Sequence, residues 1–251
     1  MMRNVLGISY SYENTFFSFS GLKGQTKVGR DGLHYFSKRV TLVFSGLEKS
    51  FMDKLIERFF FFPEIRLGDL ILAPEYVEQE HHEPLGKEVR YLCISPLVVY
   101  HGTSISKNKE FIHPTTDVFS DLLYESTILR MERSGIFKPY EISSLFKFQL
   151  SPDIQYLERI QLSEKKFARI YSTIYKNEIK EIRGYTFPFT LYADPIVQEF
   201  VYCNGFGELT QNGFGLLDLA ESSLVKREIY YGKPDEETDY SSLEDTRFNK
   251  L

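Results

Sequence analysis

Two Gly-Phe-Gly units restrict the fold of this chain more than any other feature of its sequence. They occupy Gly205–Gly207 and Gly213–Gly215, eight residues apart. Glycine adopts backbone conformations closed to other residues and lets other groups approach the main chain. No Gly-Lys-Ser/Thr follows, which excludes a P-loop, and the segment precedes a predicted strand, which excludes a dinucleotide-binding turn. The segment is therefore either a loop that offers backbone N–H groups to phosphate or a tight connection whose glycines serve only turns.

The elements predicted around this loop have a recognisable order. Asp194 followed by Pro195 is a strong helix start, and this helix is predicted to run to about Tyr202. Upstream, we predict strands over 89–100, 137–150 and 167–175, an extended segment over 180–192, a helix over 114–135 and, downstream, a strand over 213–219. The longer helix should end at Gly135, with Val118, Leu122, Leu123 and Leu129 facing inward. The order β-α-β-β-α-β with an extra hairpin is that of a ferredoxin-like domain.

The first half of the chain predicts a second, smaller unit. Strands are expected over 5–10, 15–20 and 33–44. Ser45 and Glu48 have the spacing of a capping box, and an apolar stripe at helical spacing follows, formed by Leu47, Phe51, Leu55, Ile56 and Phe59. The helix should end at Pro63, a strand should cover 65–72, and the acidic stretch 73–88 should connect two domains. We therefore predict an α+β protein with an N-terminal partial ferredoxin-like domain (1–80), a C-terminal ferredoxin-like domain (89–220) and an acidic, flexible tail (221–251).

Charge alone does not decide whether the chain binds nucleic acid. The net charge is −5, but residues 234–251 carry six acids and two bases, so the remainder is close to neutral. Bases cluster in residues 1–40 and 158–183. Clustered bases on a near-neutral body can bind phosphate, although they can equally be solvated strand faces.

Several segments resemble those of a known family. Residues 182–219 contain Arg183-Gly184-Tyr185, Phe187-Pro188-Phe189, Ala193-Asp194-Pro195 and the glycine-rich loop. This stretch resembles the C-terminal end of the RAMP-superfamily endoribonucleases that process CRISPR repeat RNA. Earlier segments are similar to the same family in the same order, so that the resemblance covers roughly residues 14–220: Phe16–Ser20, Leu47–Gly68 and Leu92–Pro96.

The resemblance implies both a fold and an activity. Such proteins have two tandem ferredoxin-like domains and bind the hairpin of a CRISPR repeat. They cleave the precursor transcript without metal or cofactor, because the 2′-hydroxyl attacks the adjacent phosphate and leaves a 2′,3′-cyclic phosphate. The implied partner is repeat RNA, with a CRISPR effector complex and a second copy of the chain as further partners. Two alternatives stay open: a non-catalytic repeat-RNA-binding relative, and a ferredoxin-like protein-interaction module.

Candidate RNA-binding residues follow from the loop and from the nearby bases. They are Gly205, Gly207, Asn212, Gly213 and Gly215 in the loop, and Arg183, Lys180, Arg169, Lys165 and Lys166 in the basic segment.

The catalytic histidine cannot be carried over from the family. In the family it usually comes from a helix that precedes the segment matched by Phe16. Met1–Thr15 is too short for a strand and a helix, so the first domain is predicted to lack both. We select His34 as the candidate because Tyr35, Lys38 and Arg39 are close in sequence, and imidazole suits general acid–base work.

The remaining signals predict no metal, no membrane and no disulfide. His81 and His82 lie between Glu80 and Glu83, but adjacent histidines in an extended segment diverge, so we expect no metal site. Two cysteines, Cys93 and Cys203, lie in apolar runs and are expected to be buried thiols in a reducing compartment. No apolar stretch is long enough to span a membrane and no signal pattern opens the chain, so a cytoplasmic protein is expected.

Overall fold

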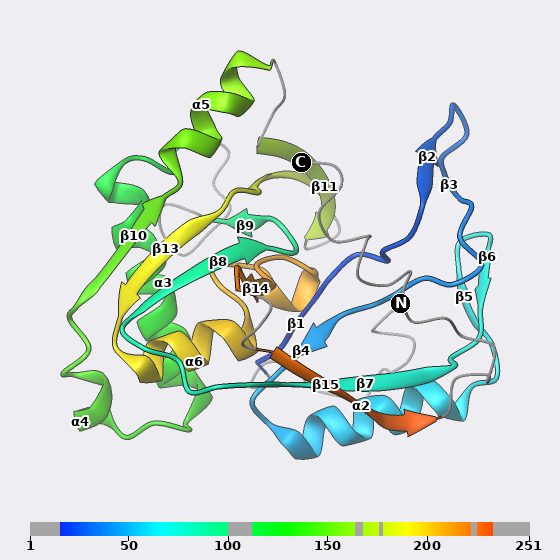
Figure 1. Cartoon of the computed structure of the whole chain (residues 1–251), viewed down its shortest axis with the longest axis horizontal. Coiled ribbons are helices and arrows are strands. Elements are labelled where there is room, and N and C mark those ends of the chain that lie inside the picture. Colours follow the sequence, from blue (N-terminus) through cyan, green and yellow to red (C-terminus); the bar gives the residue numbers. More distant parts are fainter. Residues whose placement is uncertain (1–15, 100–111, 164–167, 176–177, 222–224, 233–251) are drawn as a thin grey trace.

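The structure is a computed structural model that describes residues 16–99, 112–163, 168–175, 178–221 and 225–232 (Figure 1). The predicted strand over 5–10, the expectation that the first domain lacks its opening strand and helix, the bases Lys165 and Lys166, and most of the predicted acidic tail fall outside these residues.

A four-stranded antiparallel sheet forms the centre of the second half. Its strands lie in the order β10 (Phe148–Pro152), β13 (Phe189–Ala193), β8 (Glu88–Cys93) and β14 (Leu217–Leu219). Helix α3 (Asp117–Ser134) lies between β8 and β10 along the chain, and α6 (Pro195–Asn204) lies between β13 and β14. This is the ferredoxin-like order predicted from the sequence.

Aromatic side chains fill the space between this sheet and its two helices. Tyr91 and Phe189 from the sheet, Phe119 from α3 and Phe200 from α6 are almost completely buried in one cluster. Each such side chain contributes roughly 1.5–3 kcal/mol when it is removed from water. The core therefore fixes where α6 ends, and with it where the glycine-rich loop begins.

Helix α3 is confirmed, but its buried face differs from the predicted one. Gly135 ends it in the left-handed conformation, with φ of 66°. Of the residues expected to face inward, Leu123 is buried, whereas Val118 and Leu129 are 49% and 37% exposed. The buried face combines three apolar with three polar residues: Phe119, Leu123, Met131, Ser126, Thr127 and Arg130. Because half of these residues are polar, apolar spacing alone indicates the wrong face.

The segment between α3 and β13 is more helical than predicted. The expected strand over 137–150 contains the short helix α4 (Pro139–Ile142), and β10 starts only at Phe148. Helix α5 (Ile154–Leu162) was not predicted; Asp153 caps it by accepting from the Tyr156 N–H at 2.9 Å. The predicted strand over 167–175 is confirmed as β11 (Ala168–Tyr175), which pairs with β12 (Glu178–Tyr185). Strand β12 also pairs with β9 (Leu97–Val98).

The N-terminal half is built from small antiparallel pairs around one helix. Strand β1 (Ser18–Phe19) pairs with β4 (Phe44–Ser45), β2 (Thr26–Val28) with β3 (Leu33–Tyr35), and β5 (Ile65–Leu67) with β6 (Leu70–Leu72). Helix α2 (Lys49–Phe61) buries the predicted stripe, with Phe51, Leu55 and Phe59 packed around Phe17.

The predicted capping box of this helix is wrong. Glu48 occupies the N-cap position without a side-chain capping bond, and Ser45 belongs to β4. The pairing of β4 with β1 holds Ser45 in the sheet, so it cannot cap the helix.

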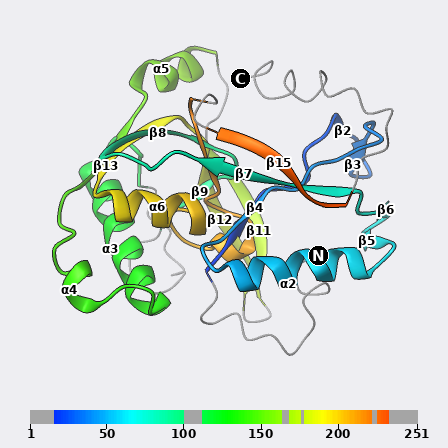
Figure 2. The same cartoon turned by 60° about the horizontal axis from the view of Figure 1, so that its bottom comes forward.

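Strands β7 (Tyr76–His82) and β15 (Val225–Gly232) form an antiparallel ribbon (Figure 2). Strand β7 lies in the segment predicted to connect two domains, and β15 lies in the predicted flexible tail. An ion pair joins the two strands: Arg227 Nε of β15 donates to Glu80 Oε1 of β7 at 2.7 Å. Strand β15 also reaches α2, because the rings of Tyr231 and Phe60 lie 4.6 Å apart. The domain boundaries stay a prediction.

None of the helices in the described residues combines the length and the apolar character that crossing a membrane requires.

Candidate functional site

The glycine-rich loop follows α6 directly and turns sharply four times. Gly205, Gly207, Gly213 and Gly215 all have positive φ, between 69° and 88°. A side chain at Gly215 would collide with the carbonyl oxygen of Phe206, and one at Gly205 would lie 2.7 Å from Ser18 Cβ. The groups that approach these glycines closely thus belong to the protein itself.

A buried arginine holds this loop from inside. Arg130 of α3 donates through Nη1 to the carbonyls of Gly205 (2.8 Å) and Gly207 (3.2 Å), and through Nη2 to that of Asn204 (2.7 Å). Nη2 also lies 3.3 Å from Thr210 Oγ1. Burial lowers the pKa of Arg130 to about 10, and the Glu208 carboxylate opposes this shift. Nothing in the sequence around Arg130 indicates this role.

Several N–H groups of the loop also have partners within the protein. Glu208 N–H donates to the Val98 carbonyl at 2.9 Å, and Gly215 N–H to that of Pro96 at 2.9 Å. Gly205, Gly207 and Gly215 are buried, whereas Asn212 is exposed. Turn geometry therefore accounts for these three glycines, and Asn212 is the predicted loop residue most open to a ligand.

The predicted basic residues do not share one face. Arg169 of β11 pairs with Gly184, and Arg183 of β12 pairs with Ile170. Because successive side chains alternate across a strand, these two exposed arginines point to opposite faces of the hairpin. Lys180 lies in β12 opposite Thr173, its side chain is not among those described, and Lys165 and Lys166 lie outside the described residues.

Arg169 has a basic neighbour that the sequence analysis did not select. Burial raises the pKa of Tyr156, and the positive charges of Arg159 and Arg169 both oppose that shift. Arg159 belongs to α5, the unpredicted helix, and is exposed. Two arginines, one from helix α5 and one from strand β11, thus lie near Tyr156.

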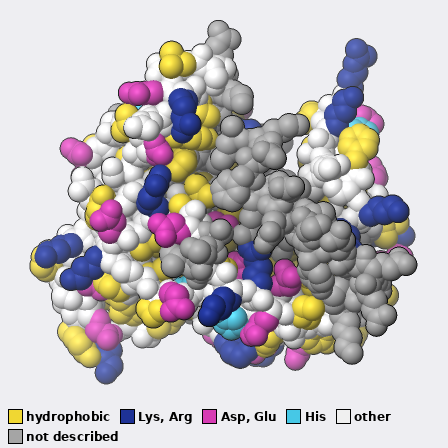
Figure 3. Space-filling model, viewed as in Figure 1, with side chains coloured by type: hydrophobic (Ala, Val, Ile, Leu, Met, Phe, Trp, Pro, Cys, Tyr) yellow, Lys and Arg dark blue, Asp and Glu magenta, His cyan; other side chains and the backbone are white. Residues whose placement is uncertain are grey.

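His34 lies on a hairpin that projects from the molecule (Figure 1). Its Nε2 is 2.8 Å from Asp31 Oδ1, and both side chains are exposed. Tyr35, the next residue, instead donates its hydroxyl to the Leu22 carbonyl at 3.1 Å. Lys and Arg side chains gather over this β2–β3 hairpin (Figure 3). They are accompanied by Phe36, which is 67% exposed.

Charged groups from four separate segments meet beside the ribbon. Desolvation lowers the pKa of Lys23, while Asp218 and Glu80 oppose this shift. Burial raises the pKa of Asp218, Glu80 adds to the rise, and Lys23 and Arg227 oppose it. The amine of Lys23 and the carboxyl of Asp218 thus each favour the charged form of the other. Lys23 and Glu80 are far in sequence from each other and from Asp218 and Arg227, so only the fold reveals the cluster.

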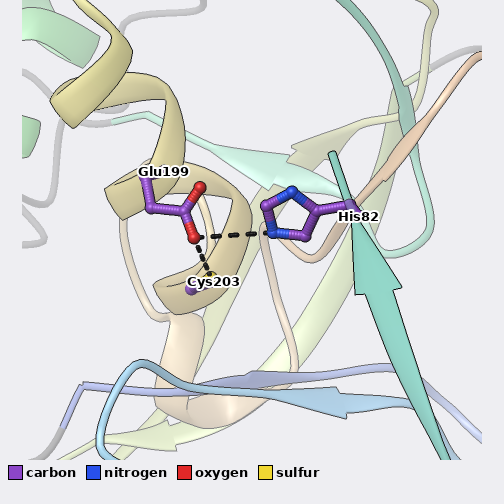
Figure 4. Close-up of side chains that lie close together, drawn as sticks. All are labelled: His82, Glu199 and Cys203. Atoms are coloured by element: carbon purple, nitrogen blue, oxygen red, sulfur yellow. Dashed lines mark hydrogen bonds and ion pairs between the residues drawn. The ribbon is translucent and has the colours of Figure 1, made fainter. Parts of the chain in front are cut away.

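A further cluster joins β7 to α6 (Figure 4). His82 Nε2 lies 3.5 Å from Glu199 Oε1, and Cys203 Sγ donates to the same oxygen at 3.5 Å. The carboxylate raises the pKa of His82, and the imidazole lowers the pKa of Glu199. Burial raises the pKa of the Cys203 thiol well above its usual range. His81 turns to Glu228 of β15 at 2.8 Å, so the adjacent histidines diverge as predicted.

The sequence model of CRISPR associated protein Cas6, C-terminal, matches residues 78–219, which is more than half of the chain. The chain belongs to the Cas6 family. The match runs from β7 through β14 and includes the glycine-rich loop, whereas the β2–β3 hairpin lies outside it. The resemblance to repeat-processing RAMP endoribonucleases is thereby confirmed.

Individual relatives extend the similarity to the first half. A putative CRISPR-associated endoribonuclease-like protein Cas6 from Pyrococcus furiosus is 25% identical over 194 residues, covering 76% of this chain and 72% of the relative. A solved structure from a Cas6-related gene of Pyrococcus furiosus has a TM-score of 0.64 at 19% identity, covering 87% and 82% of the two chains. A RAMP protein binding different RNA substrates has a TM-score of 0.61 at 24% identity, covering 84% and 82%. The predicted α+β, tandem ferredoxin-like class is confirmed by this shared fold.

Proposed function

We propose that this chain binds the hairpin of a CRISPR repeat RNA and cleaves the precursor transcript within the repeat, without a metal ion. The observation that carries the proposal is the Cas6 family match over residues 78–219. The similar Pyrococcus furiosus protein is named as endoribonuclease-like, and a protein of similar fold binds different RNA substrates. Both properties are ascribed to this chain as part of the proposal.

The β2–β3 hairpin supplies groups suited to RNA. Lys27, Arg30 and Lys38 are exposed there and can neutralise phosphates. Phe36 presents an aromatic ring on which an unpaired base can stack. Arg159 and Arg169, which both lie near Tyr156, form a second group of basic residues on the C-terminal half. In the proposal, the repeat RNA contacts both the β2–β3 hairpin and these two arginines.

His34 is the proposed general acid–base group. Its ring accepts the proton of the 2′-hydroxyl, the 2′-oxygen bonds to the adjacent phosphorus, and the bond from phosphorus to the 5′-oxygen breaks. The leaving oxygen takes up a proton, and a 2′,3′-cyclic phosphate remains. Asp31, 2.8 Å away, orients the ring.

A cleavage assay in EDTA tests this proposal. The purified chain is incubated with its own repeat RNA and with the same RNA carrying a 2′-deoxy nucleotide at the cut site. We expect cleavage of the first RNA only, and a loss of at least about 100-fold in rate for His34→Ala, the typical contribution of general acid–base catalysis. Cleavage of the deoxy RNA would disprove the 2′-hydroxyl mechanism, and an unaffected His34→Ala would exclude His34.

The second candidate function is repeat-RNA binding without cleavage. It is favoured by the position of His34 on an exposed hairpin outside the matched residues, with Tyr35 turned away toward Leu22. Tight binding without a cut product, at physiological salt, would establish it. A chain with no preference for its repeat over an unrelated hairpin would instead be a protein-interaction module.

A further inference from the structure

His82 and Cys203 each lie at a distance from Glu199 that neighbouring ligands of one metal ion also have. Around a tetrahedral Zn²⁺ with ordinary bond lengths, neighbouring N, O and S ligands lie roughly 3.4–3.6 Å apart. Glu199 Oε1 is 3.5 Å from His82 Nε2 and 3.5 Å from Cys203 Sγ. All three donor atoms lie within 4.8 Å of one another. A small movement of one side chain therefore completes the triangle.

Other histidines of the chain provide an internal comparison. His34 meets Asp31 at 2.8 Å and His81 meets Glu228 at 2.8 Å, which are the distances of direct charge-assisted bonds. His82 and Glu199 remain at 3.5 Å although both side chains are less exposed than those of the other two pairs. The longer distance leaves room for an ion between the donors.

We propose that His82, Glu199 and Cys203 bind one Zn²⁺ ion. Thiolate, imidazole and carboxylate together favour zinc over Mg²⁺ or Ca²⁺, which prefer oxygen ligands only. The Glu199 side chain is 40% exposed, so water can occupy the fourth position of the ion. No metal was expected because adjacent histidines diverge. His81 and His82 do diverge, but His82 alone lies beside two potential ligands from α6, Glu199 and Cys203.

The groups around His82 are of the kind that orient a metal-binding histidine. Its Nδ1 lies 2.9 Å from the Glu83 carbonyl, so Nδ1 carries the proton of the neutral ring, and Nε2, which faces Glu199, is the nitrogen that this form offers to a metal. The Tyr202 ring packs edge-on against the imidazole at 4.8 Å. Glu199 and Cys203 are four residues apart on α6 and therefore share one face of the helix.

Zinc binding would release a proton from the site. The Cys203 thiol gives up its proton to become the thiolate ligand, and His82 binds as the neutral imidazole. No electron transfer is involved. The ion would join β7 to the last turn of α6, immediately before Gly205. It would therefore fix the base of the glycine-rich loop, independently of any RNA.

Cobalt titration of the untagged full chain, first stripped with EDTA and then freed of chelator, tests the site. Co²⁺ replaces Zn²⁺ and gives a thiolate-to-metal charge-transfer band only when a cysteine sulfur is bound. We expect this band to saturate at one Co²⁺ per chain and to disappear when Zn²⁺ is added. Cys203→Ser should abolish the band, and His82→Asn should weaken binding at least about 10-fold, in line with the loss of a metal partner.

Matched controls are His81→Asn, which removes the neighbouring histidine, and Cys93→Ser, which removes the other thiol; both should leave the band unchanged. Zn²⁺ should also raise the unfolding temperature of the wild type but not of Cys203→Ser, because a ligand of the folded state stabilises it. A band that persists in Cys203→Ser, or no band with folded wild-type protein, would overturn the proposal and leave a hydrogen-bonded joint between β7 and α6. Neither measurement involves RNA, so failure here is separate from failure of the proposed cleavage.

Discussion

The glycine-rich loop and the β2–β3 hairpin differ in almost every physical respect. The loop lies inside the family match, is largely buried, and satisfies its backbone through Arg130 and neighbouring carbonyls. The hairpin lies outside the match, projects from the body and exposes bases, an aromatic ring and a histidine. The comparison shows that the glycine-rich loop, the most distinctive segment of the sequence, serves mainly to stabilise the fold. The groups most available to a ligand lie in the less distinctive segment.

The largest expected effect comes from removing the arginine that holds the loop. Arg130→Ala should lower the free energy of unfolding by about 3 kcal/mol or more, because several buried carbonyls lose their donor. Urea unfolding monitored by circular dichroism measures it. Arg133→Ala, an exposed position on the same helix, should stay within about 0.5 kcal/mol of the wild type. Equal stability of the two variants would mean that Arg130 does not hold the loop.

A substitution within the loop should have the next largest effect. Gly215→Ala places a Cβ against the Phe206 carbonyl and imposes a positive φ of 69° on alanine. We expect a loss of about 2 kcal/mol, read from the midpoint of thermal or urea unfolding. Gly86→Ala is the control, because its Cβ would meet nothing within 4 Å. A stable Gly215→Ala protein would indicate that the loop relaxes easily and would weaken the contrast with the hairpin.

Substitution of the hairpin bases should affect binding and spare stability. Lys27→Ala combined with Arg30→Ala should lower affinity for repeat RNA and reduce the salt dependence of log Kd by about 2, one for each lost phosphate contact. Binding is measured by fluorescence anisotropy at several salt concentrations. Lys147→Ala, at an exposed position before β10, serves as the control with an expected change near zero. An unchanged salt dependence in the double variant would place the RNA elsewhere.

The smallest effect concerns pH and the pair formed by His82 and Glu199 in metal-free protein. The pKa of His82 is raised from 6.5, so its contribution to stability is complete below that value and is lost as pH rises through the folded pKa. The pKa of Glu199 is lowered from 4.5, so its contribution is present above that value and is lost as pH falls through the folded pKa. The stability difference between wild type and His82→Gln should therefore be greatest between these two values, at less than about 1 kcal/mol because the pair is partly exposed. Unfolding in EDTA across this pH range checks it, and a difference that grows above neutral pH would contradict it.

Features that depend on neighbouring residues were predicted from the sequence, whereas features that depend on contacts between distant residues were missed. The helix start at Asp194-Pro195 and the stop at Gly135 are local, and both are confirmed. The inward face of α3 was missed because it includes Arg130, whose partners lie about 75 residues away. The ribbon was missed because β7 and β15 are rich in charge and pair only across the whole second domain.

The candidate site was less predictable than the fold for the same reason. His34 and a group of bases were predicted from the sequence. Two of these bases, Arg169 and Arg183, point to opposite faces of their hairpin. Lys23 with Asp218, and His82 with Glu199, become neighbours only after folding. Only the i, i+4 spacing of Glu199 and Cys203 on a predicted helix was available as a local signal.

The ribbon has a consequence for the order in which the chain can fold. Strand β7 leaves the ribosome long before β15, because the entire four-stranded sheet is encoded between them. Until β15 is synthesised, one edge of β7 offers its backbone groups to any passing strand. Strand β15 also contacts α2 through Tyr230, whose hydroxyl donates to Asp53 at 2.7 Å. The contacts of β15 with β7 and α2 can therefore form only after the second domain has been synthesised. A nascent protein that ends before residue 225 carries an open strand edge prone to aggregation.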